Sequence, residues 1–245
     1  MITNSFDEAH FYVIAENIKR IKEEIAEATI KSNRSVDEVR LMAVTKTVCT
    51  EYINYAIENC GIDLIGENKV QEFLSKKDTL HLEGIEKHLI GHLQTNKVKY
   101  IIDKVCMIHS VDSLKLAKEI DKRAAQHGLV MDILVQVNSA EEESKFGITT
   151  AETDQLIADI AEQCPNIRIK GLMCIEDNPE DVREYFAEVK KIYDKYVNVK
   201  TERLDFQFLS MGMTHDFEVA IEEGSNMIRV GTAIFGYRDY RSEEK

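Results

Sequence analysis

The sequence predicts an α/β fold, a single (β/α)8 TIM barrel with an extra helix at its N-terminus. The 245 residues suffice for one such barrel. Eight short apolar runs follow one another, stretches of helical periodicity lie between them, and no break in composition divides the chain. We therefore expect one domain over residues 1–245, with the N-terminal helix at 5–31 and the barrel at 41–236. An open α/β sheet with an extra hairpin is the alternative, although an open doubly wound sheet has no need of an eighth strand.

The first element is predicted to be an amphipathic helix. Ser5 and Glu8 have the spacing of a capping box, which typically marks the start of a helix. After them, isoleucines recur at steps of three and four residues, which places them on one helical face. These are Ile14, Ile18, Ile21 and Ile25.

The eight strands are predicted from short apolar runs, each bounded by polar residues or glycine. The runs are "LMAVTK" (41–46), "DLIGEN" (63–68), "HLIGH" (88–92), "MIHSV" (107–111), "DILVQVN" (132–138), "IKGLMCI" (169–175), "QFLSMG" (207–212) and "MIRVGT" (227–232).

Between the strands, two segments show helical periodicity most clearly. The segment "DSLKLAKEIDKRAAQ" (112–126) begins with Asp112, which is predicted to be its N-cap. The segment "PEDVREYFAEVKKIYDKYV" (179–197) is predicted to have Asn178 as N-cap and Pro179 at its first helical position.

Composition and charge exclude several classes of partner and location. The formal net charge of -13 repels a nucleic-acid backbone and an anionic membrane surface, so neither is expected as a partner. The 5 cysteines are an odd number and form no C-x-x-C pair, which suits a reducing compartment. The N-terminus lacks the basic start and apolar run of a signal peptide, and no segment is apolar for long enough to span a bilayer. We expect a cytoplasmic protein.

The last two predicted strands both end in small residues, and this indicates a phosphate site. Ser210, Gly212 and Thr214 follow the seventh strand, and Gly231 and Thr232 end the eighth. In (β/α)8 barrels, phosphate often binds in the loops after strands 7 and 8. The segment "THDFEVAIEEG" (214–224) is predicted to be a helix whose first N–H groups face the same anion. Either glycine alone would more simply serve a tight turn, but two such loops together favour phosphate.

Lys46 is the candidate for covalent chemistry. It ends the first predicted strand, at the rim where the catalytic side chains of a barrel are expected. A surface lysine whose amine reaches solvent is the simpler interpretation of its position alone. A lysine that shares a rim with a phosphate site suits a phosphorylated carbonyl compound, which the amine could hold as a Schiff base.

Arg229 lies among apolar residues on the eighth strand, so it needs an anion or a strong acceptor. Alternation places Met227, Arg229 and Gly231 on one face of the strand and Ile228, Val230 and Thr232 on the other. A buried ion pair with Glu67 or another rim carboxylate is as probable as contact with a ligand.

The other polar motifs indicate no further chemistry. His88 and His92 are four residues apart, but they belong to a strand that runs into a loop, where this spacing does not place them on one face. We therefore expect no metal. The segment "EEESKFG" (141–147) is interpreted as a solvated loop.

Taken together, the motifs resemble those of a known family, the pyridoxal phosphate (PLP) homeostasis proteins, which are PLP-binding relatives of the alanine racemase barrel. The segments span nearly the whole chain in order. They are "AVTKT" (43–47), "GENKVQE" (66–72), "HLIGHLQTNK" (88–97), "IHSVDSLKLA" (108–117), "ESKFGI" (143–148), "IKGLMCI" (169–175) and "LSMGMTHDFEVAIEEGSNMIRVGTAIFG" (209–236). Two departures, Lys87 before the first histidine and Glu176 after "GLMCI", concern the surroundings of the site.

The resemblance implies an alanine racemase-type barrel that binds pyridoxal 5′-phosphate through a Schiff base. Lys46 would form that bond, and Arg229 would face the pyridine nitrogen, where it disfavours protonation of the ring. The implied cofactor-binding residues are Lys46, Asn68, His92, Ser210, Met211, Arg229, Gly231 and Thr232.

The function implied by the resemblance is intracellular PLP homeostasis, as a carrier or buffer without established turnover. PLP and apo PLP-dependent enzymes would then be the partners, and the oligomeric state is left open between monomer and homodimer. A PLP-dependent amino-acid racemase or decarboxylase is the alternative, for which no second base is evident in the sequence. A phosphosugar-binding barrel without a cofactor is the third possibility.

Overall fold

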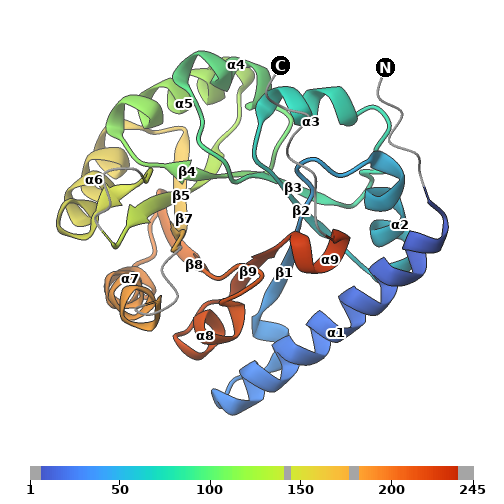
Figure 1. Cartoon of the computed structure of the whole chain (residues 1–245). Coiled ribbons are helices and arrows are strands. Elements are labelled where there is room, and N and C mark those ends of the chain that lie inside the picture. Colours follow the sequence, from blue (N-terminus) through green and yellow to red (C-terminus); the bar gives the residue numbers. More distant parts are fainter. Residues whose placement is uncertain (1–6, 141–144, 177–181, 237–245) are drawn as a thin grey trace.

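A computed structural model describes residues 7–140, 145–176 and 182–236, which form a closed barrel of parallel strands (Figure 1). Eight strands pair in the order β1-β2-β3-β4-β5-β7-β8-β9, and β9 pairs with β1 to close the ring. The predicted barrel is confirmed, and the open sheet is excluded because neither β1 nor β9 is an edge strand. The ring strands are β1 (Arg40–Val44), β2 (Leu64–Glu67), β3 (Glu86–Leu89), β4 (Met107–Val111), β5 (Met131–Asn138), β7 (Ile167–Cys174), β8 (Leu204–Ser210) and β9 (Met227–Val230).

All eight predicted runs overlap a ring strand, and the structure adds one short strand that the sequence analysis missed. This strand, β6 (Ile148–Thr149), pairs with the end of β5 outside the ring. Two residues are too few to show a period of two, so no pattern could have indicated it.

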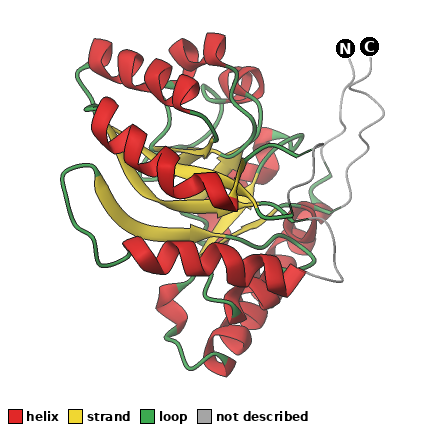
Figure 2. Cartoon of the chain, turned by 90° about the vertical axis from the view of Figure 1, so that its left-hand side faces the viewer, coloured by secondary structure: helices red, strands yellow, loops and turns green. Residues whose placement is uncertain are grey.

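Helices surround the ring, as Figure 2 shows from the side. The α-helices are α1 (Ala9–Lys31), α2 (Thr50–Cys60), α3 (Val70–Lys76), α4 (Val98–Ile101), α5 (Leu114–His127), α6 (Thr150–Gln163), α7 (Val182–Tyr196), α8 (Phe217–Glu222) and α9 (Thr232–Phe235), and two 3-10 helices are η1 (Val36–Glu38) and η2 (Thr95–Lys97).

The predicted N-terminal helix corresponds to α1, which covers the outside of the ring where β1 meets β9. Its four regularly spaced isoleucines are buried and belong to one apolar cluster with Ile228 and Val230 of β9. The predicted capping residue Ser5 lies outside the described residues, and the described helix begins at Ala9. The first helix thus covers the outside of the ring at the point where the first and last strands pair.

Inside the ring, side chains alternate as the sequence predicts. Met227 packs with Met42, Val44 and other residues in a small cluster within the barrel. The residue between the two β1 side chains, Ala43, belongs instead to the outer cluster under α1. Arg229 therefore projects inward, because it shares the face of Met227.

One helix start differs from prediction, and a second falls outside the described residues. The N-cap of α5 is Ser113 and not Asp112, since Ser113 has the extended backbone of an N-cap and its hydroxyl accepts a hydrogen bond from Leu116 N. For α7, the predicted cap Asn178 and the predicted first residue Pro179 lie outside the described residues.

Candidate functional site

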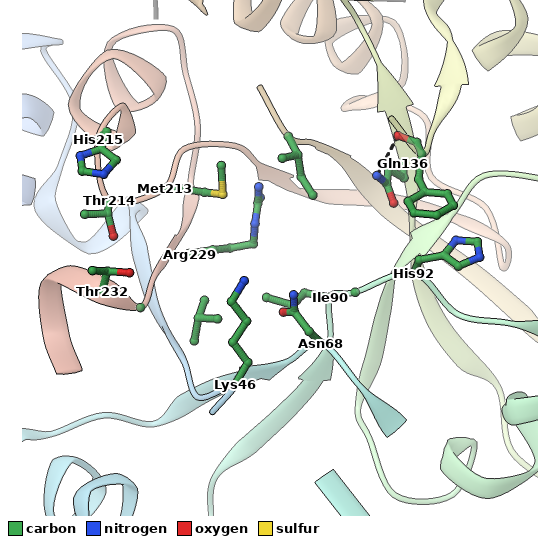
Figure 3. A pocket seen from close by; sticks show the side chains of 15 residues that line it. Lys46, Asn68, Ile90, His92, Gln136, Met213, Thr214, His215, Arg229 and Thr232 are labelled. Carbon is green, nitrogen blue, oxygen red and sulfur yellow. Dashed lines mark hydrogen bonds between the residues drawn. The ribbon is translucent and has the colours of Figure 1, made fainter. Parts of the chain in front are cut away.

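A cavity of about 500 Å³ opens at the carboxyl ends of the ring strands, where the sequence places the site (Figure 3). Residues from the ends of β1, β2, β3, β5, β7, β8 and β9 and from the loops after them form its wall. They are Val44, Lys46, Asn68, Ile90, Gly91, His92, Gln136, Phe146, Ile175, Met213, Thr214, His215, Arg229, Gly231 and Thr232.

Lys46 reaches into this cavity from the end of β1. The strand ends at Val44, and Lys46 follows two positions later, half-buried and on the inward face that Met42 and Val44 define. Figure 3 shows its amine and the Arg229 side chain extending into the same space. The structure therefore brings the predicted nucleophile and the predicted buried cation into one pocket.

Arg229 is held by neutral acceptors and not by Glu67. Its side chain is 3% exposed. Nη1 donates to the carbonyl oxygen of Ser210 at 2.7 Å and to its hydroxyl at 2.8 Å, and Nη2 donates to the carbonyl oxygen of Cys174 at 2.7 Å. Glu67 instead accepts from Thr45 and pairs with Lys76. Burial lowers the pKa of Arg229, and the nearby Cys174 and Asp216 oppose that shift.

The loops after β8 and β9 form the side of the pocket that the sequence assigns to phosphate. Met213, Thr214 and His215 line it from one loop, and Gly231 and Thr232 from the other. The loops are joined by a hydrogen bond of 3.4 Å from Ala233 N to the Thr214 hydroxyl. Hydroxyl and backbone groups thus converge there beside a buried arginine, which suits an anion.

The helix predicted over 214–224 is shorter than expected. It comprises Phe217–Glu222, and the N–H groups of Asp216 and Phe217 both donate to the Met213 carbonyl. These two N–H groups are therefore occupied within the loop and do not face the pocket. The turn around Gly212 (φ 90°) packs closely against this helix, because an added Cβ there would lie 2.7 Å from Ala220 Cβ.

Ser210 and Met211 are buried behind the pocket wall and are not among the residues that line it. The hydroxyl of Ser210 accepts a hydrogen bond from Arg229. The Met211 side chain packs in the outer apolar cluster, and its N–H donates to Ser225 Oγ at 3.4 Å. Their place in this structure is behind Arg229, which Ser210 helps to hold.

Asn68 and His92 line the pocket on the side away from the two loops. The Asn68 side-chain oxygen is buried and has no hydrogen-bond partner in the part of the chain that the structure describes. His92 is exposed and stacks on Phe146, with ring centroids 3.8 Å apart and an interplanar angle of 15°. The Phe146 carbonyl in turn accepts from Gln136 Nε2 at 3.0 Å.

The interpretation of residues 141–147 as a solvated loop is wrong at Phe146, which lines the pocket. Residues 141–144 lie outside the described residues, but Phe146 forms part of the pocket wall, although it is 54% exposed. An aromatic residue between lysine and glycine in an otherwise polar segment was the available signal. His215 was also missed, because it lies within the predicted helix.

His88 and His92 occupy different parts of the barrel. His88 is buried inside the barrel, where its Nδ1 lies 3.0 Å from Nε2 of His109, and burial lowers the pKa of both imidazoles. His92 lies at the rim instead. Among the described residues, no group of three or more His, Cys, Asp or Glu side chains could hold a metal ion.

The assembled pocket combines an amine, a buried guanidinium, an unpaired amide oxygen, and loop hydroxyl and backbone groups. An amine can condense with an aldehyde or ketone, and the other groups can bind an anion and a polar ring. Such a pocket suits a phosphorylated carbonyl compound.

Comparison with known proteins gives consistent matches over most of the chain. The family model of the alanine racemase N-terminal domain matches residues 14–239. The pyridoxal phosphate homeostasis protein of Aquifex aeolicus is 42% identical over 228 residues, which cover 92% of this chain and 98% of that protein. The protein of the same name from Escherichia coli K12 is 36% identical over 230 residues, which cover 93% of this chain and 97% of that protein. The structure of PipY from Synechococcus elongatus with PLP bound is 32% identical, has a TM-score of 0.72, and covers 88% of this chain and 100% of PipY.

Proposed function

This chain belongs to the pyridoxal phosphate homeostasis proteins, within the alanine racemase N-terminal domain family, and on this premise we propose that it binds PLP in the barrel pocket and acts as an intracellular PLP carrier. The observation that carries the proposal is the presence of Lys46 and Arg229 in one cavity with the two small-residue loops. PLP supplies an aldehyde that a lysine amine can bind covalently.

The residues present fit this cofactor. Lys46 would bind the aldehyde, and Gly231, Thr232 and the loop after Ser210 would hold the phosphate. The buried side-chain oxygen of Asn68, which has no hydrogen-bond partner among the described residues, offers an acceptor to a bound ring substituent. Gly91 keeps the wall beside it close, since an added Cβ would lie 2.3 Å from the Asn68 carbonyl oxygen. Met211 would contribute through its contacts behind the wall, and His92 would lie at the rim.

Arg229 supports a carrier over a catalyst. Its guanidinium is a permanent charge fixed by Ser210 and Cys174, and a cation facing the pyridine nitrogen disfavours protonation of that nitrogen. An unprotonated ring withdraws electrons weakly, so a carbanion at a bound amino acid is poorly stabilised. The pocket would therefore assist carbanion chemistry less than a pocket that pairs the ring nitrogen with a carboxylate.

The first experiment is a visible absorbance spectrum of purified protein supplied with PLP, followed by borohydride reduction and mass analysis of peptides. We expect a visible band and added mass at Lys46. Lys46→Ala should abolish both, while Lys115→Ala, which removes an exposed lysine of α5, should change neither. A colourless protein that PLP cannot reconstitute would refute the proposal and favour a phosphosugar-binding barrel.

A second experiment separates the carrier from the enzyme. A racemase needs two bases on opposite faces of the substrate carbon, and the pocket contains His92 and His215 besides Lys46. A carrier should transfer PLP to apo PLP-dependent enzymes and leave every amino acid unracemised. Steady racemisation that Lys46→Ala and His215→Gln abolish would instead establish an enzyme.

The domain organisation, location, oligomeric state and recipients of PLP are part of the same proposal. We propose a single-domain barrel that acts in the cytoplasm as a monomer or homodimer, with apo PLP-dependent enzymes as recipients. No described helix is both long and apolar enough to cross a bilayer.

A further inference from the structure

The peptide groups on both sides of Lys46 are held by one ion pair of α3. Lys76 Nζ donates to the carbonyl oxygen of Thr45, the residue before Lys46, at 3.0 Å. The carboxylate of Glu72 accepts a hydrogen bond from the N–H of Thr47, the residue after it. Lys76 and Glu72 are themselves an ion pair one helical turn apart. One pair thus contacts the backbone immediately before and immediately after the lysine that reaches into the pocket.

The backbone directly after the second contact is in an unfavourable conformation. Thr47 has φ of +60°, a left-handed value that a β-branched residue rarely adopts. Such a residue persists only where its surroundings hold it, and this is often the case at functional sites. Two hydrogen bonds hold this turn in place: Thr47 N donates to Glu72, and Val48 N donates to the Thr45 carbonyl oxygen at 3.2 Å.

Burial makes this pair more rigid than a surface ion pair. The side chains of Lys76 and Glu72 are 13% and 16% exposed. Lys76 also lies 3.4 Å from Glu67, which is 2% exposed and accepts from the Thr45 hydroxyl at 2.7 Å. Burial raises the pKa of Glu67, and the charge of Lys76 opposes that shift. The pair is therefore anchored to β2 through Glu67 as well as to the loop after β1.

We propose that Glu72 and Lys76 are positioning residues for Lys46, because they fix the strained turn that directs its amine into the pocket. The proposal deepens the PLP-binding function and rests on it for the identity of the carbonyl compound. Neither residue lines the cavity, so their effect would be on covalent bond formation and not on recognition of the ligand. A displaced amine reacts slowly because it must be reoriented before each attack.

The test compares two ligands that differ only at the reacting carbon. Stopped-flow absorbance would follow formation of the covalent lysine bond with PLP, and titration would measure the Kd of pyridoxine 5′-phosphate, which has an alcohol in place of the aldehyde. Glu72→Ala should slow covalent bond formation by roughly tenfold or more. The Kd of the variant for pyridoxine 5′-phosphate should stay within about twofold of the wild-type value. This ligand forms no covalent bond with Lys46, so its affinity does not depend on the direction of the amine.

Two further variants distinguish positioning from general loss of structure. Thr47→Gly allows positive φ without strain, so Thr47→Gly combined with Glu72→Ala should recover much of the lost rate. Glu72→Gln keeps an oxygen that can accept the hydrogen bond from Thr47 N. Covalent bond formation should therefore be slowed less in Glu72→Gln than in Glu72→Ala. Glu119→Ala is the matched control, because Glu119 pairs with Arg123 one turn away on α5, outside the site.

The outcomes separate the two hypotheses. An unchanged rate of covalent bond formation in Glu72→Ala would refute the positioning role and leave PLP binding intact. Equal losses of rate and of pyridoxine 5′-phosphate affinity, with no recovery by Thr47→Gly, would also refute it, since the whole pocket would then have changed. Wild-type protein that forms no covalent bond with PLP would refute the PLP function itself, and the positioning role with it.

Discussion

At the scale of single residues, Arg229 combines a structural and a binding role. Replacing it with Met removes the guanidinium donors that now reach the carbonyl oxygens of Ser210 and Cys174. Each buried acceptor left unpaired costs about 1–3 kcal/mol. We expect Arg229→Met to lower the free energy of unfolding by about 2–4 kcal/mol in urea denaturation. Arg123→Met, at a more exposed ion pair, should cost less than about 1 kcal/mol, and equal stabilities of the two variants would contradict the expectation.

The sequence predicts which charged side chains share the pocket better than it predicts the rest of the pocket wall. Arg229 was identifiable because a charged residue in an apolar strand must meet a ligand or a partner, and Lys46 because it follows the first strand at the rim of the barrel. Ser210 and Met211 are predicted to contact the cofactor, and in this structure they are buried and do not line the cavity. Strand alternation specifies which face a residue occupies, but not how far along the barrel the cavity extends.

Phe146 and His215 show what the sequence could not indicate. Both residues reach the pocket from loops, and the direction of a loop depends on tertiary contacts. The stacking of Phe146 on His92 joins residues 54 positions apart (146 − 92). No local pattern predicts such a contact.

At the scale of elements, the sheet depends on a glycine where β7 passes β8. Gly171 has φ of +147°, and an added Cβ would lie 1.8 Å from the Phe208 carbonyl oxygen, at a shift in the register of the two strands. We expect Gly171→Ala to cost about 4 kcal/mol or more in chemical denaturation.

Gly128 provides the matched control for this prediction. It also has positive φ, at 64°, but an added Cβ would meet nothing within 4 Å. Gly128→Ala should therefore cost only about 1 kcal/mol, the conformational penalty alone. A similar loss of stability in both variants would show that close packing at Gly171 is unimportant.

The same pair of strands carries a pH-dependent contact. Hydrogen bonds from Lys170 and then from Lys200 lower the pKa of Asp205 to about 2. A lowered pKa stabilises the folded state above the ordinary value near 4, and this contribution is lost as pH falls toward 2. We expect wild type to exceed Asp205→Asn in stability by about 1 kcal/mol at pH 7, after allowing for screening by solvent. Urea unfolding at pH 7 and pH 3 should show the difference narrowing, whereas a constant difference would contradict this assignment.

Most of the elements were predictable, because their apolar residues recur with the period of a strand or of a helix, which the two residues of β6 are too few to show. All eight ring strands and the long helices α1, α5 and α7 follow from patterns of apolar residues. The first residue of a helix was harder to predict where two neighbouring residues could both be the N-cap, as Asp112 and Ser113 could at the start of α5. There the hydrogen bond from Leu116 N to the Ser113 hydroxyl decides.

At the scale of the whole molecule, closure of the ring links α1 to the pocket. Ile21 is fully buried in the cluster that covers the outside of β9, the strand that carries Arg229 inside. We expect Ile21→Ala to cost about 2–5 kcal/mol. Ile30→Ala, on the same helix but 65% exposed, should change stability by less than about 0.5 kcal/mol.

If the barrel is a single domain, the helix α1 and the pocket should unfold together, in Ile21→Ala as in the wild type. Unfolding followed by circular dichroism and by loss of a ligand bound in the pocket should coincide, because all eight strands complete the ring. Separate transitions would show that α1 and the pocket belong to different cooperative units.

The pairing of β1 with β9 also orders events during protein synthesis. The chain that forms β1 is complete at Val44, but its partner begins only at Met227, 183 residues later (227 − 44). At about 5–20 residues per second, the ribosome needs roughly 10–40 s for that interval. Throughout it, the nascent chain carries Lys46 without Arg229 or Gly231. If the pocket binds PLP as proposed, only finished chains retain it, so the amount of bound cofactor reports how many molecules have folded and not how many have been started.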